Sequence, residues 1–191
     1  MNYLIFDTET TGIPRRRNAP VTDVANWPRL VQIAWQIYDG EENRVEAFEA
    51  IIRPDGFVIP PDAARVHGIT QERAREEGVP LMEVLPAFMK GGDIADVLVA
   101  HNIRFDANIM GAEFVRAGME SDMFTKRQVC TMESSTEFCQ IPGPYGFKWP
   151  TLSELHYTLF RTSFIDEHNA TADVEACARC FFQLKHLHII S

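Results

Sequence analysis

The amino-acid sequence predicts an α/β fold with a mixed central sheet. Short apolar runs rich in β-branched and aromatic residues occur at 3–6, 30–38, 45–53 and 97–100, which is typical of strands. Other segments repeat apolar residues with a helical period, and the predicted order is strand, strand, strand, helix, strand, helix and then mostly helix. This order indicates an α/β domain with strands of both directions.

The first half of the chain is predicted to hold most of the strands. A buried strand at 3–6 is followed by an irregular insertion loop at about 13–29, because three prolines in this segment disfavour a regular element. Loops of this length inside compact domains are usually functional or disordered. A turn at 39–40 then joins the runs 30–38 and 45–53, which predicts an antiparallel hairpin.

Helices are predicted from capping residues and apolar spacing. Thr70 opens a polar helical stretch to Glu77, and the pair Gly91-Gly92 is expected to end the next helix. Thr151 and Glu154 have the spacing of a capping box. The predicted helices cover residues 70–77, 81–90, 105–117, 151–160 and 173–187.

Length and composition favour one globular domain that spans residues 1–191. The chain is 46% hydrophobic and 24% charged, as is usual for a soluble protein. No apolar run approaches the roughly 20 residues that a membrane-spanning helix needs. The first strand starts a residue or two after Met1, which leaves no room for a signal peptide, so we expect a cytoplasmic protein without a membrane partner.

The charge balance argues against a broad basic surface for binding nucleic acid. The chain has 18 Lys and Arg residues and 27 Asp and Glu residues, a net charge of −9, which disfavours a broad basic binding surface. A short strand held at a metal-filled cleft is still compatible, because bound cations outweigh local negative charge. The four cysteines form no disulfide framework, and Cys177 and Cys180, three apart on one face of a predicted helix, are interpreted as packing residues.

Three polar clusters stand at the ends of predicted elements. Ligand sites in α/β folds tend to form where loops and helix ends meet at strand termini, so we expect these clusters to lie together. They are Asp7-Thr-Glu9 after the first strand, His101-Asn-Ile-Arg-Phe-Asp106 after the strand at 97–100, and His168-Asn-Ala-Thr-Ala-Asp173 before the last helix.

The first cluster, taken alone, is consistent with a solvated turn, because Asp, Thr and Gly are turn formers, and equally with a divalent metal site. Asp7 and Glu9 share one face of the strand because a strand alternates faces with period two, whereas Thr8 points away and is expected to pack. Two like charges so placed repel, and a hard cation such as Mg²⁺ or Mn²⁺ would compensate them.

The other two clusters add two carboxylates and a histidine to Asp7 and Glu9. With Asp106 and Asp173 there are four carboxylates, which can hold two divalent ions for the displacement of a phosphoryl group. His168 beside them could take the proton from the attacking water.

Together the clusters resemble, in order, the three exonuclease motifs of the DEDD exonuclease superfamily. The histidine five residues before the last aspartate is similar to the DEDDh, or DnaQ-like, branch, which includes the proofreading epsilon subunit of bacterial DNA polymerase III. The segments that carry the resemblance are Asp7-Thr-Glu9-Thr-Thr-Gly12, His101-Asn-x-x-Phe105-Asp106, His168-x-x-x-x-Asp173 and Arg65-Val66-His67-Gly68-Ile69-Thr70.

The resemblance implies a ribonuclease H-like fold with a mixed five-stranded central sheet flanked by helices. It also implies the removal of nucleoside monophosphates from 3′ ends with two Mg²⁺ or Mn²⁺ ions. By position, the implied metal ligands are Asp7, Glu9, Asp106 and Asp173, and the implied general base is His168. The implied substrate-binding residues are Thr10, Val66, His67 and Phe105.

Other interpretations stay open for residues outside the carboxylates. Phe105 and Ile109 lie four apart on a predicted helix, so Phe105 is equally consistent with a core position. His67 precedes Gly68 and is also consistent with a turn, and His101 is interpreted as a structural residue that fixes the strand end.

Arg15-Arg16-Arg17 is the only dense basic run in this acidic chain. Its default interpretation is a solvated loop tip. Our hypothesis is that these arginines hold the strand upstream of the scissile phosphate, because phosphates pair with arginine.

The sequence therefore predicts a metal-dependent 3′-to-5′ exonuclease that acts on single-stranded ends, with DNA favoured over RNA. Two alternatives stay open. One is an exoribonuclease of the same family, because the sequence does not show what meets the 2′-hydroxyl. The other is a catalytically inactive nucleic-acid-binding module on the same fold. No clamp-binding or polymerase-binding tail is evident, so the sequence does not support association with a polymerase.

Overall fold

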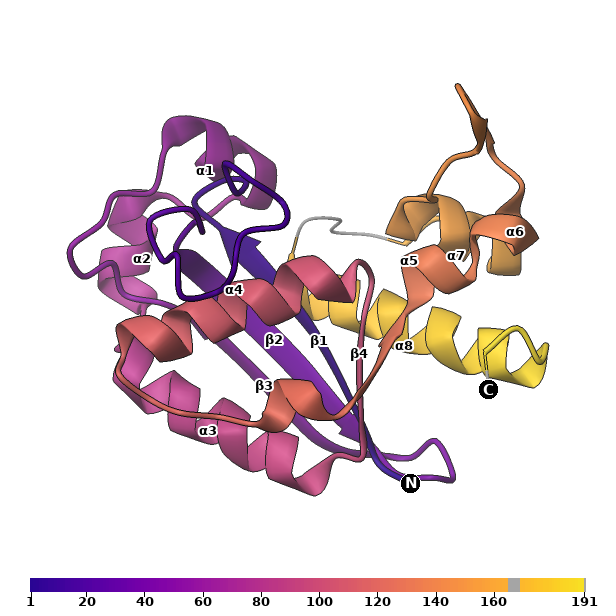
Figure 1. Cartoon of the computed structure of the whole chain (residues 1–191), viewed down its shortest axis with the longest axis horizontal. Helices are drawn as coiled ribbons and strands as arrows, with labels where there is room; N and C mark the ends of the chain where they lie inside the picture. The colour runs from indigo at the N-terminus through magenta and orange to yellow at the C-terminus, as the bar shows by residue number, and fades with distance from the viewer. Residues whose placement is uncertain (165–168, 191) are drawn as a thin grey trace.

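The computed structural model describes residues 1–164 and 169–190 of the chain, and its centre is a five-stranded sheet (Figure 1). The strands are β1 Tyr3–Thr10, β2 Leu30–Tyr38, β3 Arg44–Ile51, β4 Val97–Ala100 and β5 Arg127–Cys130. Their order in the sheet is β3-β2-β1-β4-β5. β2 pairs antiparallel with both β1 and β3, whereas β4 pairs parallel with both β1 and β5. The predicted mixed sheet, with its antiparallel hairpin, is therefore confirmed.

Helices flank both faces of this sheet (Figure 1). Among the described residues, no helix is both long and apolar enough to cross a bilayer. The helices are α1 Pro61–His67, α2 Gln71–Glu77, α3 Leu81–Ile94, α4 Ile103–Arg116, α5 Thr131–Ser134, α6 Thr136–Cys139, α7 Leu152–Phe160 and α8 Ala170–His186. A 3-10 turn at Met123–Thr125 and a small hairpin of β6 Pro142–Gly143 and β7 Gly146–Phe147 complete the elements.

The side chains of β1 divide between the two faces of the sheet. Leu4 and Phe6 belong to the core cluster that includes α3 and α4, and Tyr3 and Ile5 belong to the cluster that includes α8. Because side chains alternate along a strand, the residues that follow Phe6 continue the same division. The odd-numbered carboxylates of β1 therefore lie on the α8 face.

The helix predicted at 81–90 does not end where the sequence predicts. α3 continues through Gly91 and Gly92 to Ile94, so the predicted end at these glycines is wrong. A Cβ atom on Gly91 would lie 3.2 Å from Leu4 Cδ1 and 3.3 Å from Trp35 Nε1. Glycine here allows the helix backbone to approach the sheet closely.

Several short elements, among them α1 and β5, are not predicted from the sequence. α1 lacks a side-chain cap and follows Pro60 directly, and β5 is a four-residue strand with two exposed residues. Such short elements give little periodic signal. In contrast, the capping box at Thr151 and Glu154 is confirmed at the start of α7.

Residues 11–29 form no helix or strand, as predicted for this irregular loop. Hydrogen bonds nevertheless hold the loop against α4. The Arg116 Nη2 group donates hydrogen bonds to the carbonyl oxygens of Val24 and Trp27, both at 2.6 Å. The Trp27 side chain is buried in the core beside α4. The loop is therefore an ordered part of the fold.

Candidate active site

The candidate site lies where β1 extends beyond its parallel neighbour β4. β1 pairs with β2 along its whole length, but with β4 only through Tyr3, Leu4 and Ile5. After Ala100 the chain turns through Asn102, whose φ of 78° is left-handed, into α4. The backbone edge of β1 beyond Ile5 therefore faces the first turn of α4.

Asp106, in that first turn, is held by the backbone and side chain of one residue on β1. Its Oδ1 atom accepts hydrogen bonds from the Thr8 N–H at 3.1 Å and from the Thr8 Oγ1 at 2.7 Å. Asp106 is only 2% exposed. Thr8 points away from Asp7 and Glu9, as predicted, but it orients Asp106 as well as packing, and the sequence does not reveal this role.

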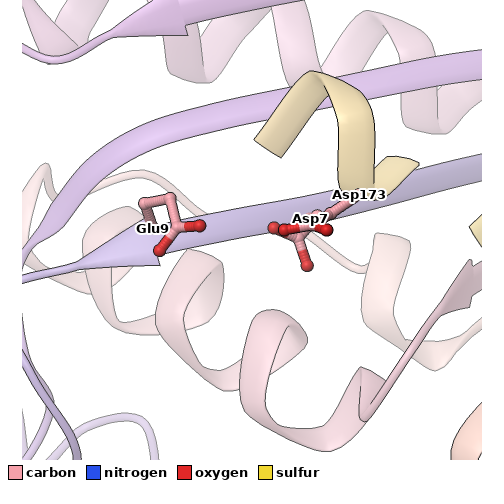
Figure 2. A group of neighbouring side chains, drawn as sticks. All are labelled: Asp7, Glu9 and Asp173. Atoms are coloured by element: carbon pink, nitrogen blue, oxygen red, sulfur yellow. The ribbon is translucent and has the colours of Figure 1, made fainter. Parts of the chain in front are cut away.

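Three of the predicted metal ligands meet on the α8 face of β1. Asp7 and Glu9 project from the strand, and Asp173 projects toward Asp7 from the first turn of α8 (Figure 2). Each residue offers one carboxylate oxygen to this group, and the three oxygens all lie within 4.8 Å of one another. The fold thus brings together carboxylates that are separated by more than half of the chain.

Burial and mutual repulsion raise the pKa of these carboxyl groups. Desolvation is the main cause for Asp7, whose pKa is raised well above its ordinary value, and the charges of the other three carboxylates add to it. Burial, with the charges of Asp173 and Asp106, raises the pKa of Glu9 to about 8. Burial raises the pKa of Asp106 to about 7, although the hydrogen bonds from Thr8 oppose this shift. Ionising the whole cluster is therefore costly without a cation.

The donor set fits a hard divalent cation. Mg²⁺ and Mn²⁺ prefer carboxylate oxygens, and three of them converge here from two rigid elements. A bound cation would remove the repulsion that raises the pKa of Asp7 and Glu9. The residues present are thus suited to hold metal.

The start of α8, which carries Asp173, is fixed by polar contacts. Asn169 caps the helix by accepting a hydrogen bond from the Thr171 N–H at 3.1 Å. Gln32 on β2 accepts one from the Ala170 N–H at 3.4 Å. Gln32 is only 2% exposed, and a glutamine within a largely apolar strand is the sequence signal that could have identified this contact.

The predicted substrate-binding residues lie on three different segments. Thr10 ends β1, and its Oγ1 donates a hydrogen bond to a nearby backbone carbonyl at 2.7 Å. Val66 and His67 end α1, where Val66 is exposed and His67 is buried and accepts a backbone hydrogen bond at Nδ1. Phe105 on α4 packs against the core, which agrees with the core interpretation, and it also lines a pocket, while its contact with substrate stays a prediction.

The structure describes only one of the two histidines in the predicted clusters, His101. His168, the predicted general base, lies outside the described residues, and its role stays a prediction. The His101 ring contacts the Thr131 Oγ1 and the Pro150 carbonyl oxygen, each at 3.0 Å. Burial lowers the pKa of His101 to about 4. These contacts agree with the structural role predicted for His101.

The fold is similar to that of solved exonuclease structures. A zinc-bound complex of E. coli ExoI with single-stranded DNA is 22% identical, with a TM-score of 0.74 over 97% of this chain and 40% of that chain. E. coli Exonuclease I in complex with a dT13 oligonucleotide is 20% identical, with a TM-score of 0.76 over 96% of this chain and 41% of that chain. At these identities the likeness establishes the fold.

Sequence relatives and a family model give more specific information. DNA polymerase III PolC-type of Lactococcus lactis is 29% identical over 181 residues, and that of Streptococcus pyogenes is 30% identical over 183. These matches cover 94% of this chain, but the chain spans only about a tenth of the length of either relative. The model of the exonuclease family RNase_T matches residues 4–181. The chain therefore belongs to the RNase_T family of exonucleases, as its three acidic motifs predict.

Proposed function

We infer that this chain is a divalent-metal-dependent 3′-to-5′ exonuclease, with residues 1–191 as one exonuclease domain. Its proposed reaction is hydrolysis of the last phosphodiester bond at the 3′ end of single-stranded DNA, which releases a nucleoside 5′-monophosphate. The observation that carries this proposal is the convergence of the Asp7, Glu9 and Asp173 carboxylates within 4.8 Å. Membership of the exonuclease family supports the same reaction.

Each residue of the site has a distinct part in the proposed reaction. Two Mg²⁺ or Mn²⁺ ions, when bound, supply positive charge at the scissile phosphate. Asp7, Glu9, Asp106 and Asp173 hold them. His168 takes the proton of the water whose oxygen attacks phosphorus, and the bond from phosphorus to the 3′ oxygen breaks, so that the shortened strand keeps a 3′-hydroxyl.

The terminal nucleotide is proposed to lie against the three segments that flank the carboxylates. Thr10, Val66, His67 and Phe105 are the proposed contacts. An aromatic ring such as Phe105 stacks on any base, which suits an exonuclease that must release every nucleotide in turn.

DNA is the proposed substrate rather than RNA. The curated relatives carry the name DNA polymerase III, and the similar E. coli structures contain single-stranded DNA or a dT13 oligonucleotide. The name of the relatives also supports a setting beside a DNA polymerase.

The proposal is tested with DNA and RNA strands of one sequence, each labelled at the 5′ end. We expect a ladder of products one nucleotide apart on DNA with Mg²⁺ or Mn²⁺, and none with a chelator. Asp7→Asn and His168→Ala should each reduce the rate by at least about 100-fold, because each removes a ligand or the base. Asp55→Asn, at an exposed acid in a loop, is the matched control and should retain the full rate.

Three outcomes would contradict the proposal. Degradation of RNA alone would identify an exoribonuclease, and internal cleavage products would identify an endonuclease. Binding of strands without any cleavage in Mn²⁺ would identify a binding module.

A further inference from the structure

A pocket of about 570 Å³ lies next to the candidate site. Its walls come from the loop at 13–29, the first turns of α4, α5 and the segment before α7. Phe105, the neighbour of Asp106, lines it, but among the described residues that form its walls there is no Thr10, Val66 or His67. The pocket is therefore distinct from the residues proposed to hold the terminal nucleotide, while sharing Phe105 with them.

The walls combine cations with aromatic faces. Arg17 and Arg104 line the pocket together with Phe105 and Trp149, and one acid, Glu133, is among the described lining residues. Trp149 is 55% exposed, an unusual state for so large an apolar side chain. Arginine beside exposed aromatic rings is the combination that binds single-stranded nucleic acid, because phosphates pair with the guanidinium and bases stack on the rings.

The basic run in the loop divides into residues with different surroundings. Arg16 forms an ion pair with Asp23 at 2.7 Å, so its guanidinium already has a carboxylate partner. Arg17 lines the pocket, and within residues 1–164 and 169–190 it has no ion-pair partner. Arg15 is exposed and is not among the lining residues. Of the three arginines in this run, Arg17 is therefore the one whose charge is available to a phosphate at the pocket.

The loop wall is held in place by a buried network. The Oε1 atom of Glu113, a fully buried residue of α4, accepts hydrogen bonds from the Arg29 Nε at 3.0 Å and the Leu30 N–H at 2.9 Å. An exposed hydrogen bond adds to this network, since Arg104 Nη2 on α4 donates to Asn18 Oδ1 in the loop at 2.9 Å. Because the wall is fixed before any ligand arrives, little ordering entropy opposes binding.

We propose that this pocket binds the nucleotide on the 5′ side of the one being released. The Trp149 ring stacks on its base, and Arg17 and Arg104 pair with the phosphates on either side. This inference rests on the proposed exonuclease function and extends it, since it assigns a second nucleotide position built largely from the 13–29 loop.

The test compares two substrates that differ in this nucleotide. One is a single-stranded oligothymidylate of eight residues, and the other is the p-nitrophenyl ester of thymidine 5′-monophosphate, which has no nucleotide upstream of the scissile bond. We expect Trp149→Leu and Arg17→Gln each to lower the ratio of kcat/KM for the oligonucleotide to that for the ester by about tenfold, mostly through KM. Arg17→Gln should also reduce the slope of log affinity against log salt by about 0.7, the value for one lost phosphate contact on a single strand.

Matched controls lie close by in the chain. Arg15→Gln removes the same charge from the same run, and Tyr145→Leu removes a fully exposed aromatic ring from the turn of the β6–β7 hairpin. Neither residue lines the pocket, so both variants should keep the wild-type ratio.

The outcomes separate this inference from the proposed function. Failure of the wild-type protein to hydrolyse either substrate in Mn²⁺ would reject the proposed function. An active wild type whose Trp149→Leu and Arg17→Gln variants keep the ratio, or lose both activities in parallel, would reject the pocket alone.

Discussion

Thr8 shows how one side chain places a carboxylate that lies 98 residues later in the chain. Its N–H and its hydroxyl both donate to the same oxygen of Asp106, at a point where β1 has no strand beside it on that edge. The second oxygen of Asp106 makes neither of these bonds. Thr8 therefore determines which oxygen of Asp106 is left for a ligand.

We expect Thr8→Val, which keeps the shape of the side chain but lacks the hydroxyl, to reduce metal affinity or activity by about 10- to 100-fold. In the wild type the hydrogen bond from the Thr8 hydroxyl lowers the pKa of Asp106. Its loss should raise that pKa, so the pH profile of activity should also move to higher pH. Rates measured from pH 6 to 9 at several Mn²⁺ concentrations would show both effects.

Thr8→Ser is the matched control, because it retains the hydroxyl. It should recover most of the activity at an unchanged pH midpoint. If Val and Ser at this position behaved alike, the role of the hydroxyl in orienting Asp106 would be disproved.

The junction between α2 and the sheet depends on a close approach of backbone atoms. Gly78 follows α2 directly, and a Cβ atom at this position would lie 2.2 Å from the Ala74 carbonyl oxygen and 2.7 Å from the Arg53 nitrogen. The next residue, Val79, accepts a hydrogen bond from the Arg53 N–H at 2.8 Å. Because backbone atoms cannot move aside as a side-chain tip can, only glycine fits here.

Gly78→Ala should therefore destabilise the protein by about 2 kcal/mol or more, in the range found for overpacked sites. Gly92→Ala within α3 is the control, since the atoms nearest to its new methyl group belong to the flexible Met123 side chain and the helix gains propensity. We expect the control to change the free energy of unfolding by less than about 1 kcal/mol. Urea unfolding measures both values, and equal losses would contradict the close-approach explanation.

At the scale of the whole molecule, the acidic cluster makes stability depend on pH and metal. The pKa of Glu9 is raised from 4.5 to about 8 on folding, and that of Asp106 from 3.8 to about 7. A raised folded-state pKa gives stability that is fully present below the unfolded value and is lost as pH rises through the folded value. His101 acts in the opposite sense below pH 6.5, because its pKa is lowered to about 4.

We therefore expect the metal-free protein to lose stability from pH 6.5 to 8.5, where the carboxyl groups titrate and His101 is already neutral. Mn²⁺ at 100 times its dissociation constant should raise the free energy of unfolding at pH 8.5 by about 2.7 kcal/mol. Urea unfolding at each pH, in chelator and in Mn²⁺, measures both effects.

Glu9→Gln is the control for this prediction, because it removes one of the titrating groups. Its metal-free stability should fall less steeply over the same pH range, and its gain from Mn²⁺ should be smaller. A wild-type protein that becomes more stable in chelator as pH rises to 8.5 would contradict the assigned shifts.

Local rules explain which parts of the fold and site the sequence predicts. Strand alternation places Asp7 and Glu9 on one face, and capping chemistry locates the start of α7 at Thr151. Both rules depend on neighbours within a few residues. The short elements α1 and β5 escape prediction because so few residues carry no clear period.

By itself, the sequence determined the chemistry of this protein: an α/β fold and an exonuclease family with acidic motifs at the ends of its elements. Only the tertiary structure decided that Thr8 orients Asp106, that Gln32 holds the start of α8, and that Arg17 and Trp149 line one pocket. The physical reason is the range of the interactions. Periodicity and capping depend on residues that lie close together in the sequence. The contacts of Thr8, Gln32, Arg17 and Trp149 join distant segments and exist only once the helices have packed against the sheet.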